Sequence, residues 1–134
     1  IPDSILHKKG RLNPGEWQEM KRHAEYGAEI LDKAPSLRRF IPAVRHHHEW
    51  YDGSGYPDGL SREAIPVAAA IISLVDAYDA MTSDRPYRTA MTGEQALNTI
   101  GESSGRQFDP RLTSIFLRTV MKHDRPGIAA PRSG

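Results

Sequence analysis

The segment 45–57 restricts the fold most, because three adjacent histidines at positions 46–48 run directly into residues rich in glycine and proline. Neighbouring side chains on a helix point about 100° apart, so three consecutive imidazoles cannot all face one apolar core. The glycines and the proline that follow exclude a helix between residues 52 and 60. The sequence therefore predicts a helix that ends at the histidines, above a rigid loop.

The histidine run by itself is compatible with two roles. Imidazole is the commonest metal ligand in proteins, which favours a metal or catalytic site. It also suits the negative end of a helix dipole, so a polar helix end without further function remains open. The helical phase directs His48 inward and His47 to one side, and His46 is then either a bystander or a residue that supports the ligands through a hydrogen bond.

Composition indicates one compact domain and excludes several classes of function. The chain has 134 residues, 38% of them hydrophobic, and a net charge of +1, which argues against a polymeric nucleic acid as partner. It has no cysteine, so a transition metal would need His, Asp or Glu ligands. No apolar run approaches the roughly 20 residues that span a bilayer. We expect a cytoplasmic segment without membrane contact, and an anchor elsewhere in a longer protein is compatible with this.

Helix-start signals recur along the chain and predict an all-α fold. The starts lie at Asn13-Pro14, Ser36, Pro66, Thr92 and Phe108-Asp109-Pro110. The first helix, or pair of helices, meets or breaks near His23. No alternating apolar and polar run exceeds four residues, so strands are not expected. We expect residues 1–122 to form the domain and residues 123–134 to form a disordered tail.

Two carboxylates interrupt the most apolar helix of the chain. Asp76 and Asp79 are three residues apart and share one side of a helix whose expected inner face comprises Val67, Ala70, Ile71, Leu74, Val75 and Tyr78. A charge in a buried helix is costly unless it is paired or bound to a cation. We therefore expect a metal ligand or a paired acid at this position.

Four candidate metal ligands lie on three predicted helical segments, namely His23, His47, His48 and Asp76. A lone histidine at the position of His23 is more often a hydrogen-bonded core residue than a ligand, so the ligand role of His23 depends on the other three. A set of nitrogen and carboxylate donors without sulfur fits Fe or Mn, and it fits Zn or Ni less selectively. Two such ions about 3.5–4 Å apart would clamp a phosphodiester and activate water.

Two arginines follow the apolar helix and have two alternative roles. Arg85 and Arg88 would neutralise the oxygens of a bound phosphate, or they would pair with Asp84 and Glu94. Tyr56 belongs to the loop after the histidines, where it is either a binding residue or an ordinary loop aromatic. The residues alone leave these alternatives open.

Three blocks occur in order along the chain, namely His47-His48-Glu49, then residues 52–60 (DGSGYPDGL), then residues 76–88 (DAYDAMTSDRPYR). Together they resemble the HD-GYP family of bacterial cyclic-di-GMP phosphodiesterases, and the similarity runs from Ile1 to Pro110. The resemblance implies a helical bundle of the HD superfamily with two or three metal ions. It also implies hydrolysis of cyclic-di-GMP to linear pGpG, and in some members to GMP.

The resemblance implies roles for individual residues. His23, His47, His48 and Asp76 would be metal ligands, the last three of them at the catalytic centre. Arg85, Arg88 and Tyr56 would bind substrate. The loop around Tyr56 would also be a surface for diguanylate cyclase domains.

One departure from the family limits what this chain is expected to do. In the family, the HD doublet, a lysine after it and an earlier ligand-bearing helix precede the residues that match Ile1-Pro2-Asp3, and here the sole His-Asp pair is His123-Asp124. Ala24 also stands where proline is common. We expect the C-terminal part of an HD-GYP domain, weakly active or inactive alone. The alternatives are a degenerate module that binds cyclic-di-GMP or a cyclase, and a purely structural helical domain.

The same departure predicts exposed apolar surface. The apolar faces around Trp17, Ile30 and Leu74 would lack cover from preceding helices, which favours a homo-oligomer or exchange of helices with a second copy.

Overall fold

The computed structural model describes residues 3–86 and 88–123. The elements are α1 (Asp3–Leu6), α2 (Pro14–Lys21), α3 (His23–Asp32), η1 (Pro35–Phe40), α4 (Ile41–His46), η2 (Arg62–Ala64), α5 (Val67–Thr82), α6 (Gly93–Glu102) and α7 (Pro110–His123). Within these ranges there is no β-strand, which confirms the all-α prediction. The predicted tail lies outside the described residues apart from His123, which ends α7.

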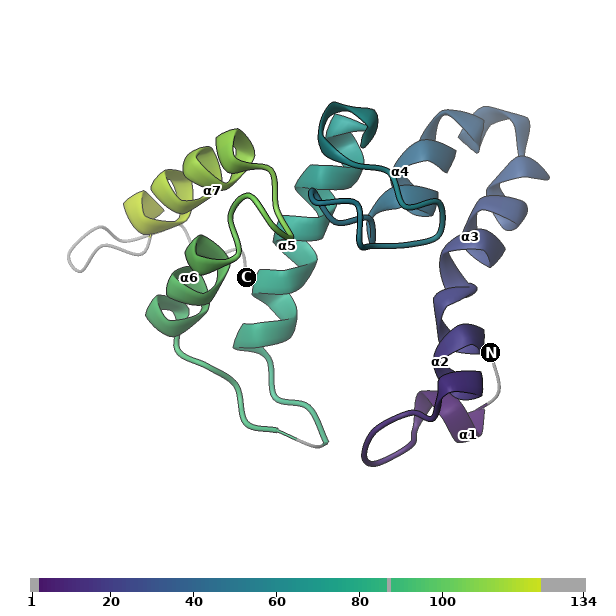
Figure 1. Ribbon diagram of the computed structural model, residues 1–134, viewed down its shortest axis with the longest axis horizontal. Helices are drawn as coiled ribbons and strands as arrows, with labels where there is room; N and C mark the ends of the chain where they lie inside the picture. The colour runs from purple at the N-terminus through teal and green to yellow at the C-terminus, as the bar shows by residue number, and fades with distance from the viewer. Residues whose placement is uncertain (1–2, 87, 124–134) are drawn as a thin grey trace.

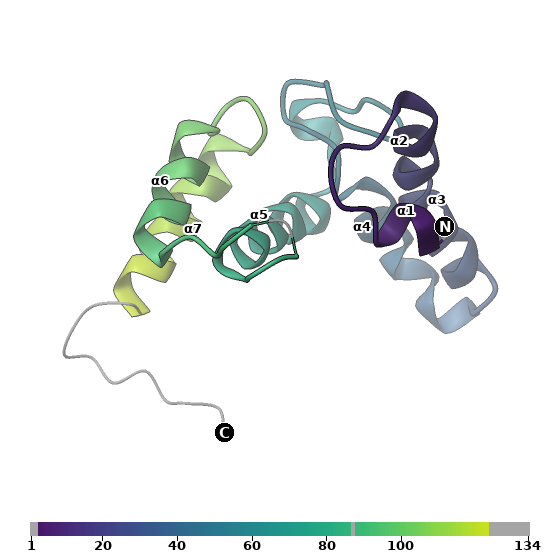
Figure 2. The same ribbon diagram turned by 90° about the horizontal axis from the view of Figure 1, so that it is seen from below.

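Helix α5 lies in the middle of the molecule and separates two groups of helices. Figure 1 shows α2, α3 and α4 on one side of α5 and the pair α6 and α7 on the other. Figure 2 shows the same division from a perpendicular direction. Helix α3 packs on α4, α4 packs on α5, and α5 packs on both α6 and α7. The loop between α4 and α5 contains the predicted glycine-rich segment.

Most of the predicted helix starts are confirmed by their caps. Asn13 Oδ1 accepts from Glu16 N at 2.8 Å, and Glu16 Oε2 accepts from Asn13 N at 2.9 Å, which completes a capping box. Thr92 and Gln95 form the same reciprocal arrangement at the start of α6. Helix α2 ends at Lys21 and α3 begins at His23, so the first predicted helix is two helices.

The predicted start at Ser36 is wrong. Residues Pro35–Phe40 form a 3₁₀-helix that follows Ala34 without a side-chain cap, and the α-helix begins later, at Ile41. Proline explains the interruption, because Pro42 has no N–H with which to continue an α-helical hydrogen-bond ladder from residue 38. Pro42 is itself tolerated in the first turn of α4, because the N–H groups of a first turn have no partner within the helix.

The apolar core lies among α5, α6 and α7. Leu74, Ile100 and Phe108 are its fully buried centre, each at most 2% exposed. Partly buried side chains around them are Ala77, Tyr78, Met81, Leu112, Phe116 and Leu117. Leu74 was expected to be exposed and is instead buried, because α6 and α7 cover this side of α5. Trp17 and Ile30 are 45% and 69% exposed, as predicted.

The other side of α5 differs from the expected inner face. Val67, Ile71 and Val75 repeat every four residues and are between 46% and 61% exposed, so they form an apolar stripe rather than a buried face. The helix is covered by α4 on one flank and by α6 and α7 on another. The sequence pattern of α5 identified apolar positions correctly but could not tell which of them the described helices cover.

Small residues fill the contacts among α3, α4 and α5. The buried residues here are Ala24, Ala28, Ala43 and Ala69. Gly27 allows the closest approach, because a Cβ at this position would lie 2.7 Å from Val44 Cγ1. The close crossing of α3 and α4 places the start of one helix beside the end of the other.

Candidate metal centre

The crossing of α3 and α4 brings three imidazoles together. His23 begins α3, whereas His47 and His48 directly follow α4. The ring centroids lie 4.6 Å apart for His23 and His48, 4.1 Å for His47 and His48, and 5.9 Å for His23 and His47. One ring nitrogen from each lies within 4.8 Å of the other two. Three of the four predicted ligands therefore converge.

Backbone carbonyls orient two of these rings. The Nδ1 atom of His23 lies 2.6 Å from Met20 O, and that of His47 lies 2.7 Å from Val44 O. A carbonyl oxygen can only accept, so Nδ1 donates in both cases and each ring keeps a lone pair on Nε2. Metal-bound imidazoles are held in the same way, through a hydrogen bond from the second ring nitrogen. The donor set therefore fits a metal ion.

The third imidazole is held in its neutral form. Burial, together with the positive charges that His47 and His23 can carry, lowers the pKa of His48 to about 4. A neutral imidazole is the form that binds a metal. At neutral pH, His48 thus offers a lone pair without first losing a proton.

Asp76 borders the same site but does not join the three-imidazole group. It lines a cavity of about 340 Å³ together with His47, His48, Ser73, Ala77, Asp79, Ala80, Arg85 and Gln107. The expectation that Asp76 and Asp79 lie in a buried helix is wrong, since both are exposed. The part of α5 that carries them lines the open cavity, so solvent stabilises their charge, and Ser83 Oγ also donates to Asp79 Oδ1 at 3.5 Å.

The two arginines after α5 differ in their surroundings. Arg85 lines the cavity beside the histidines. Arg88 donates from Nη2 to Ala80 O at 2.6 Å, which places its guanidinium at the end of α5. Their backbones exchange hydrogen bonds of 3.0 and 3.1 Å. Asp84 accepts from Ala90 N at 2.8 Å and so shapes the same turn.

Tyr56 covers the histidines from the loop. Its ring stacks on His48 with centroids 5.0 Å apart and planes 15° apart, and Trp17 meets its edge at 6.0 Å. Burial raises the pKa of Tyr56 to about 12, so the phenol keeps its proton at neutral pH. Tyr56 lines a second, smaller cavity beside Lys21 and Arg22 rather than the cavity of Asp76.

Comparison with known families identifies the fold. Residues 1–112 match the HD domain family. The chain belongs to the HD domain family. This confirms the family expected from the sequence. Among the described residues of this HD domain, no helix has the length and apolarity needed to cross a membrane.

Relatives of the HD domain are named as cyclic-dinucleotide phosphodiesterases. The cyclic di-GMP phosphodiesterase response regulator RpfG of Xanthomonas campestris is 48% identical over 122 residues, which cover 88% of this chain and 32% of the relative. The 3′3′-cGAMP-specific phosphodiesterase 2 of Vibrio cholerae is 41% identical, with 87% of this chain and 23% of the relative covered. The chain thus spans a third or less of the length of these relatives.

A solved structure agrees with the fold. The crystal structure of a cyclic GMP-AMP-specific phosphodiesterase of V. cholerae (V-cGAP3) matches with a TM-score of 0.69 and 23% sequence identity. The match covers 85% of this chain and 26% of that one. At this identity the likeness supports the fold of the HD domain.

Sequence reasoning missed one residue of the site. Glu49 belongs to the motif after His48, yet no role was predicted for it. It is 2% exposed and contacts the loop, while His46 and Asp58 complete a second group of potential ligand atoms around it. A carboxylate directly after a histidine run and before a glycine-rich turn is the signal that could have indicated this role.

Proposed function

We propose that this HD domain belongs to a metal-dependent phosphodiesterase that hydrolyses cyclic-di-GMP to linear pGpG. The observation that carries the proposal is the convergence of His23, His47 and His48, with two of the rings fixed by carbonyls. The relatives named as cyclic-dinucleotide phosphodiesterases support the substrate class.

The metal site would use the imidazoles of His23, His47 and His48, with Asp76 as a further ligand from the cavity wall. Imidazole and carboxylate donors without sulfur favour Fe or Mn, with Zn or Ni as alternatives. A bound ion would supply positive charge beside the phosphate and make a coordinated water more acidic.

The protein's own side chains would bind and orient the dinucleotide. Arg85 lines the cavity of the histidines, where its guanidinium can donate two hydrogen bonds to phosphate oxygens. Arg88 would assist from the end of α5, where it also holds Ala80 O. Tyr56 stays protonated and so can donate a hydrogen bond.

A binding module without turnover is the second candidate. It is favoured by the number of ligands, because the group that converges here in the described residues consists of three imidazoles and Asp76 stands apart. Three or four ligands can hold one ion, whereas a two-metal centre needs bridging groups. We expect the 134-residue chain by itself to hydrolyse cyclic-di-GMP weakly or not at all.

The test combines metal content with product analysis. The natural protein, meaning the chain at whatever length its own cell makes it, and the 134-residue chain would be reconstituted with Fe(II) or Mn(II) without oxygen. Elemental analysis would give bound metal, and chromatography would follow conversion of cyclic-di-GMP or 3′3′-cGAMP. We expect metal and pGpG with the natural protein, both lost in His48→Ala and kept in His7→Ala, an exposed histidine. Metal without turnover would favour the binding module, and no metal in either protein would contradict both functions.

The expected partners remain predictions from the sequence. Docking of a diguanylate cyclase domain would use the loop around Tyr56, where Ser54 and Asp58 are exposed. Association of two copies would use apolar surface such as Trp17 and Ile30. Co-purification of a cyclase domain and sedimentation of the purified chain would test them separately. A cytoplasmic location belongs to the same set of proposals.

A further inference from the structure

Glu49 is buried and uses both carboxylate oxygens inside the loop. Its side chain has no exposed area. Oε1 accepts from Asp58 N at 2.8 Å, and Oε2 accepts from Leu60 N at 3.0 Å. His46 Nδ1 lies 3.3 Å from Oε1. A buried carboxylate is tolerated when hydrogen bonds replace its hydration, and here two backbone donors do so.

The group formed by His46, Glu49 and Asp58 is a hydrogen-bond network that holds the loop rather than a cation site. Arg45 Nε and Nη2 donate to the two carboxylate oxygens of Asp58 at 2.9 and 3.1 Å. The guanidinium already supplies the positive charge that a cation would bring, and it would repel one. Glu49 likewise has backbone partners on each oxygen.

The loop is also held on the other side of Tyr56. Tyr56 N donates to His48 O at 3.2 Å. Gly55 lies so close to the preceding chain that a Cβ would come within 2.5 Å of His48 O and 2.6 Å of Glu49 Cα. Tyr56 therefore stands between two attachments, one to the backbone of His48 and one to the carboxylate of Glu49.

We propose that Glu49 is a positioning residue, which fixes the loop so that the Tyr56 ring stays stacked on His48. The catalytic consequence rests on the proposed function, because it assumes that Tyr56 contacts substrate. The anchoring of the loop by Glu49 does not rest on the proposed function, because the hydrogen bonds from the amides of Asp58 and Leu60 are present whether or not the protein turns over substrate. Glu49 thus determines substrate affinity through Tyr56, without binding metal or substrate.

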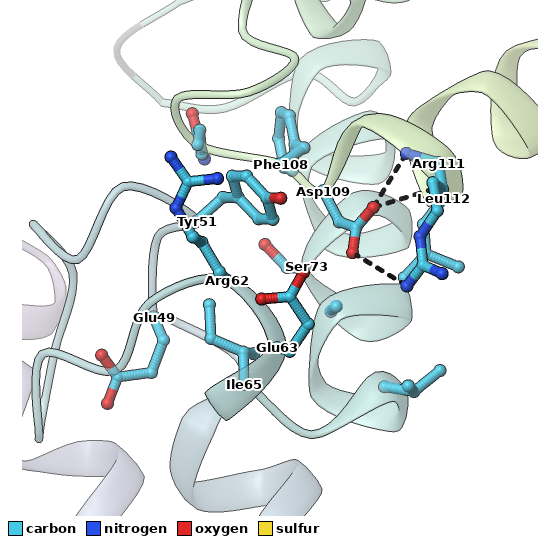
Figure 3. Close-up of a pocket in the computed structure, with 13 residues that line it drawn as sticks. Glu49, Tyr51, Arg62, Glu63, Ile65, Ser73, Phe108, Asp109, Arg111 and Leu112 are labelled. Atoms are coloured by element: carbon cyan, nitrogen blue, oxygen red, sulfur yellow. Dashed lines mark hydrogen bonds and ion pairs between the residues drawn. The ribbon is translucent and has the colours of Figure 1, made fainter.

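Glu49→Gln tests this role with little change in side-chain shape. Glutamine offers one acceptor oxygen and one NH₂ group, so one of the two backbone N–H donors would face another donor. Glu63→Gln is the matched control. Both glutamates line one cavity of about 80 Å³. Figure 3 shows the carboxylate of Glu49 directed away from Glu63. Glu63 is exposed, so its neutralisation should leave the loop unchanged.

The first measurement is amide hydrogen exchange at Asp58 and Leu60 by NMR. In the unaltered protein both amides should be protected, and this needs no variant. Glu49→Gln should raise their exchange at least tenfold, while the amides of Ala96 to Ile100 in α6 stay protected. Rapid exchange at both amides in the unaltered protein would overturn the proposal, whether or not the protein hydrolyses cyclic-di-GMP.

The second measurement separates positioning from metal binding. In the natural protein, Glu49→Gln should keep the metal content, raise KM for cyclic-di-GMP about tenfold and change kcat little. In a Tyr56→Ala background the same substitution should raise KM much less, because the two residues act through one contact. Loss of a metal equivalent, or an undiminished effect without Tyr56, would overturn the proposal. A wild-type protein that binds no metal and is inactive would instead contradict the proposed function.

Discussion

His23 begins α3 and His48 follows α4, yet their rings meet edge to face with centroids 4.6 Å apart. Removal of one imidazole should therefore break the site. We expect His23→Ala to weaken metal binding by more than the roughly 10–100-fold loss typical of an outer-shell partner. Titration calorimetry with Mn(II) would measure it, with His7→Ala as a control of unchanged affinity. Equal affinity in both variants would show that His23 is not a ligand.

Gly55 has no room for a side chain. A Cβ would lie 2.5 Å from His48 O, so the loop would have to move away from the histidines. We expect Gly55→Ala to lower the free energy of unfolding by about 1–3 kcal/mol, as overpacking does. Urea unfolding would measure it.

The control for this change is Gly15→Ala. At Gly15 the nearest atom to a Cβ is Asn13 Oδ1 at 3.4 Å, and alanine is the better helix former by about 0.5–1 kcal/mol. The two substitutions should therefore have opposite signs. Similar losses from both would contradict the close backbone contact at residue 55.

Arg45 makes the stability of the loop depend on pH. Its hydrogen bond and charge hold the pKa of Asp58 below the ordinary value of 3.8. A depressed folded-state pKa contributes stability that is present above 3.8 and is lost as pH falls through the folded-state pKa. We expect Asp58→Asn to lower the free energy of unfolding at pH 7 by less than about 1 kcal/mol, because the pair is partly exposed.

Urea unfolding at several pH values would show this dependence. The difference between wild type and Asp58→Asn should shrink as the pH falls below 3.8, where the wild-type carboxylate also becomes neutral. A difference that stays constant from pH 7 to pH 3 would assign the effect of Asp58→Asn to something other than its charge.

Substitution of Arg85 should affect substrate binding, whereas substitution of Arg88 should affect stability. Arg85 lines the cavity, so Arg85→Ala should raise KM for cyclic-di-GMP about 10–100-fold, the effect of a charged hydrogen bond of about 1.5–3 kcal/mol. Arg88→Ala should lower the free energy of unfolding by about 1 kcal/mol, because Ala80 O loses its donor. Steady-state kinetics and urea unfolding on both variants would separate the two roles. The reverse pattern would exchange their assignments.

Local signals in the sequence were sufficient for much of the fold. The capping residues Asn13 and Thr92 act over three positions, so each start is encoded where it occurs. Ser36 failed because Pro35 begins a 3₁₀-helix and Pro42 delays the α-helix. Two prolines seven residues apart thus outweighed a favourable cap.

Burial was harder to predict than helix position. Leu74 and Val75 are adjacent and equally apolar, yet one belongs to the core and the other is half exposed. The convergence of His23 with His48 depends on the crossing of two helices, which spacing alone cannot give. The burial of Glu49 was missed for the same reason, since its partners, the amides of Asp58 and Leu60, lie 9 and 11 residues away.

The core cluster of Leu74, Ile100 and Phe108 lies among α5, α6 and α7, whereas the buried residues of α3 and α4 are alanines. The two parts should accordingly open with different free energies, as independent cooperative units. An ion held by His23, His47 and His48 would act as a cross-link of the weaker unit, since binding to the folded state stabilises it by mass action. Hydrogen exchange should then slow in α3 and α4 on addition of metal and stay constant in α6. In this molecule, metal binding at the three histidines would therefore be thermodynamically coupled to the folding of α3 and α4.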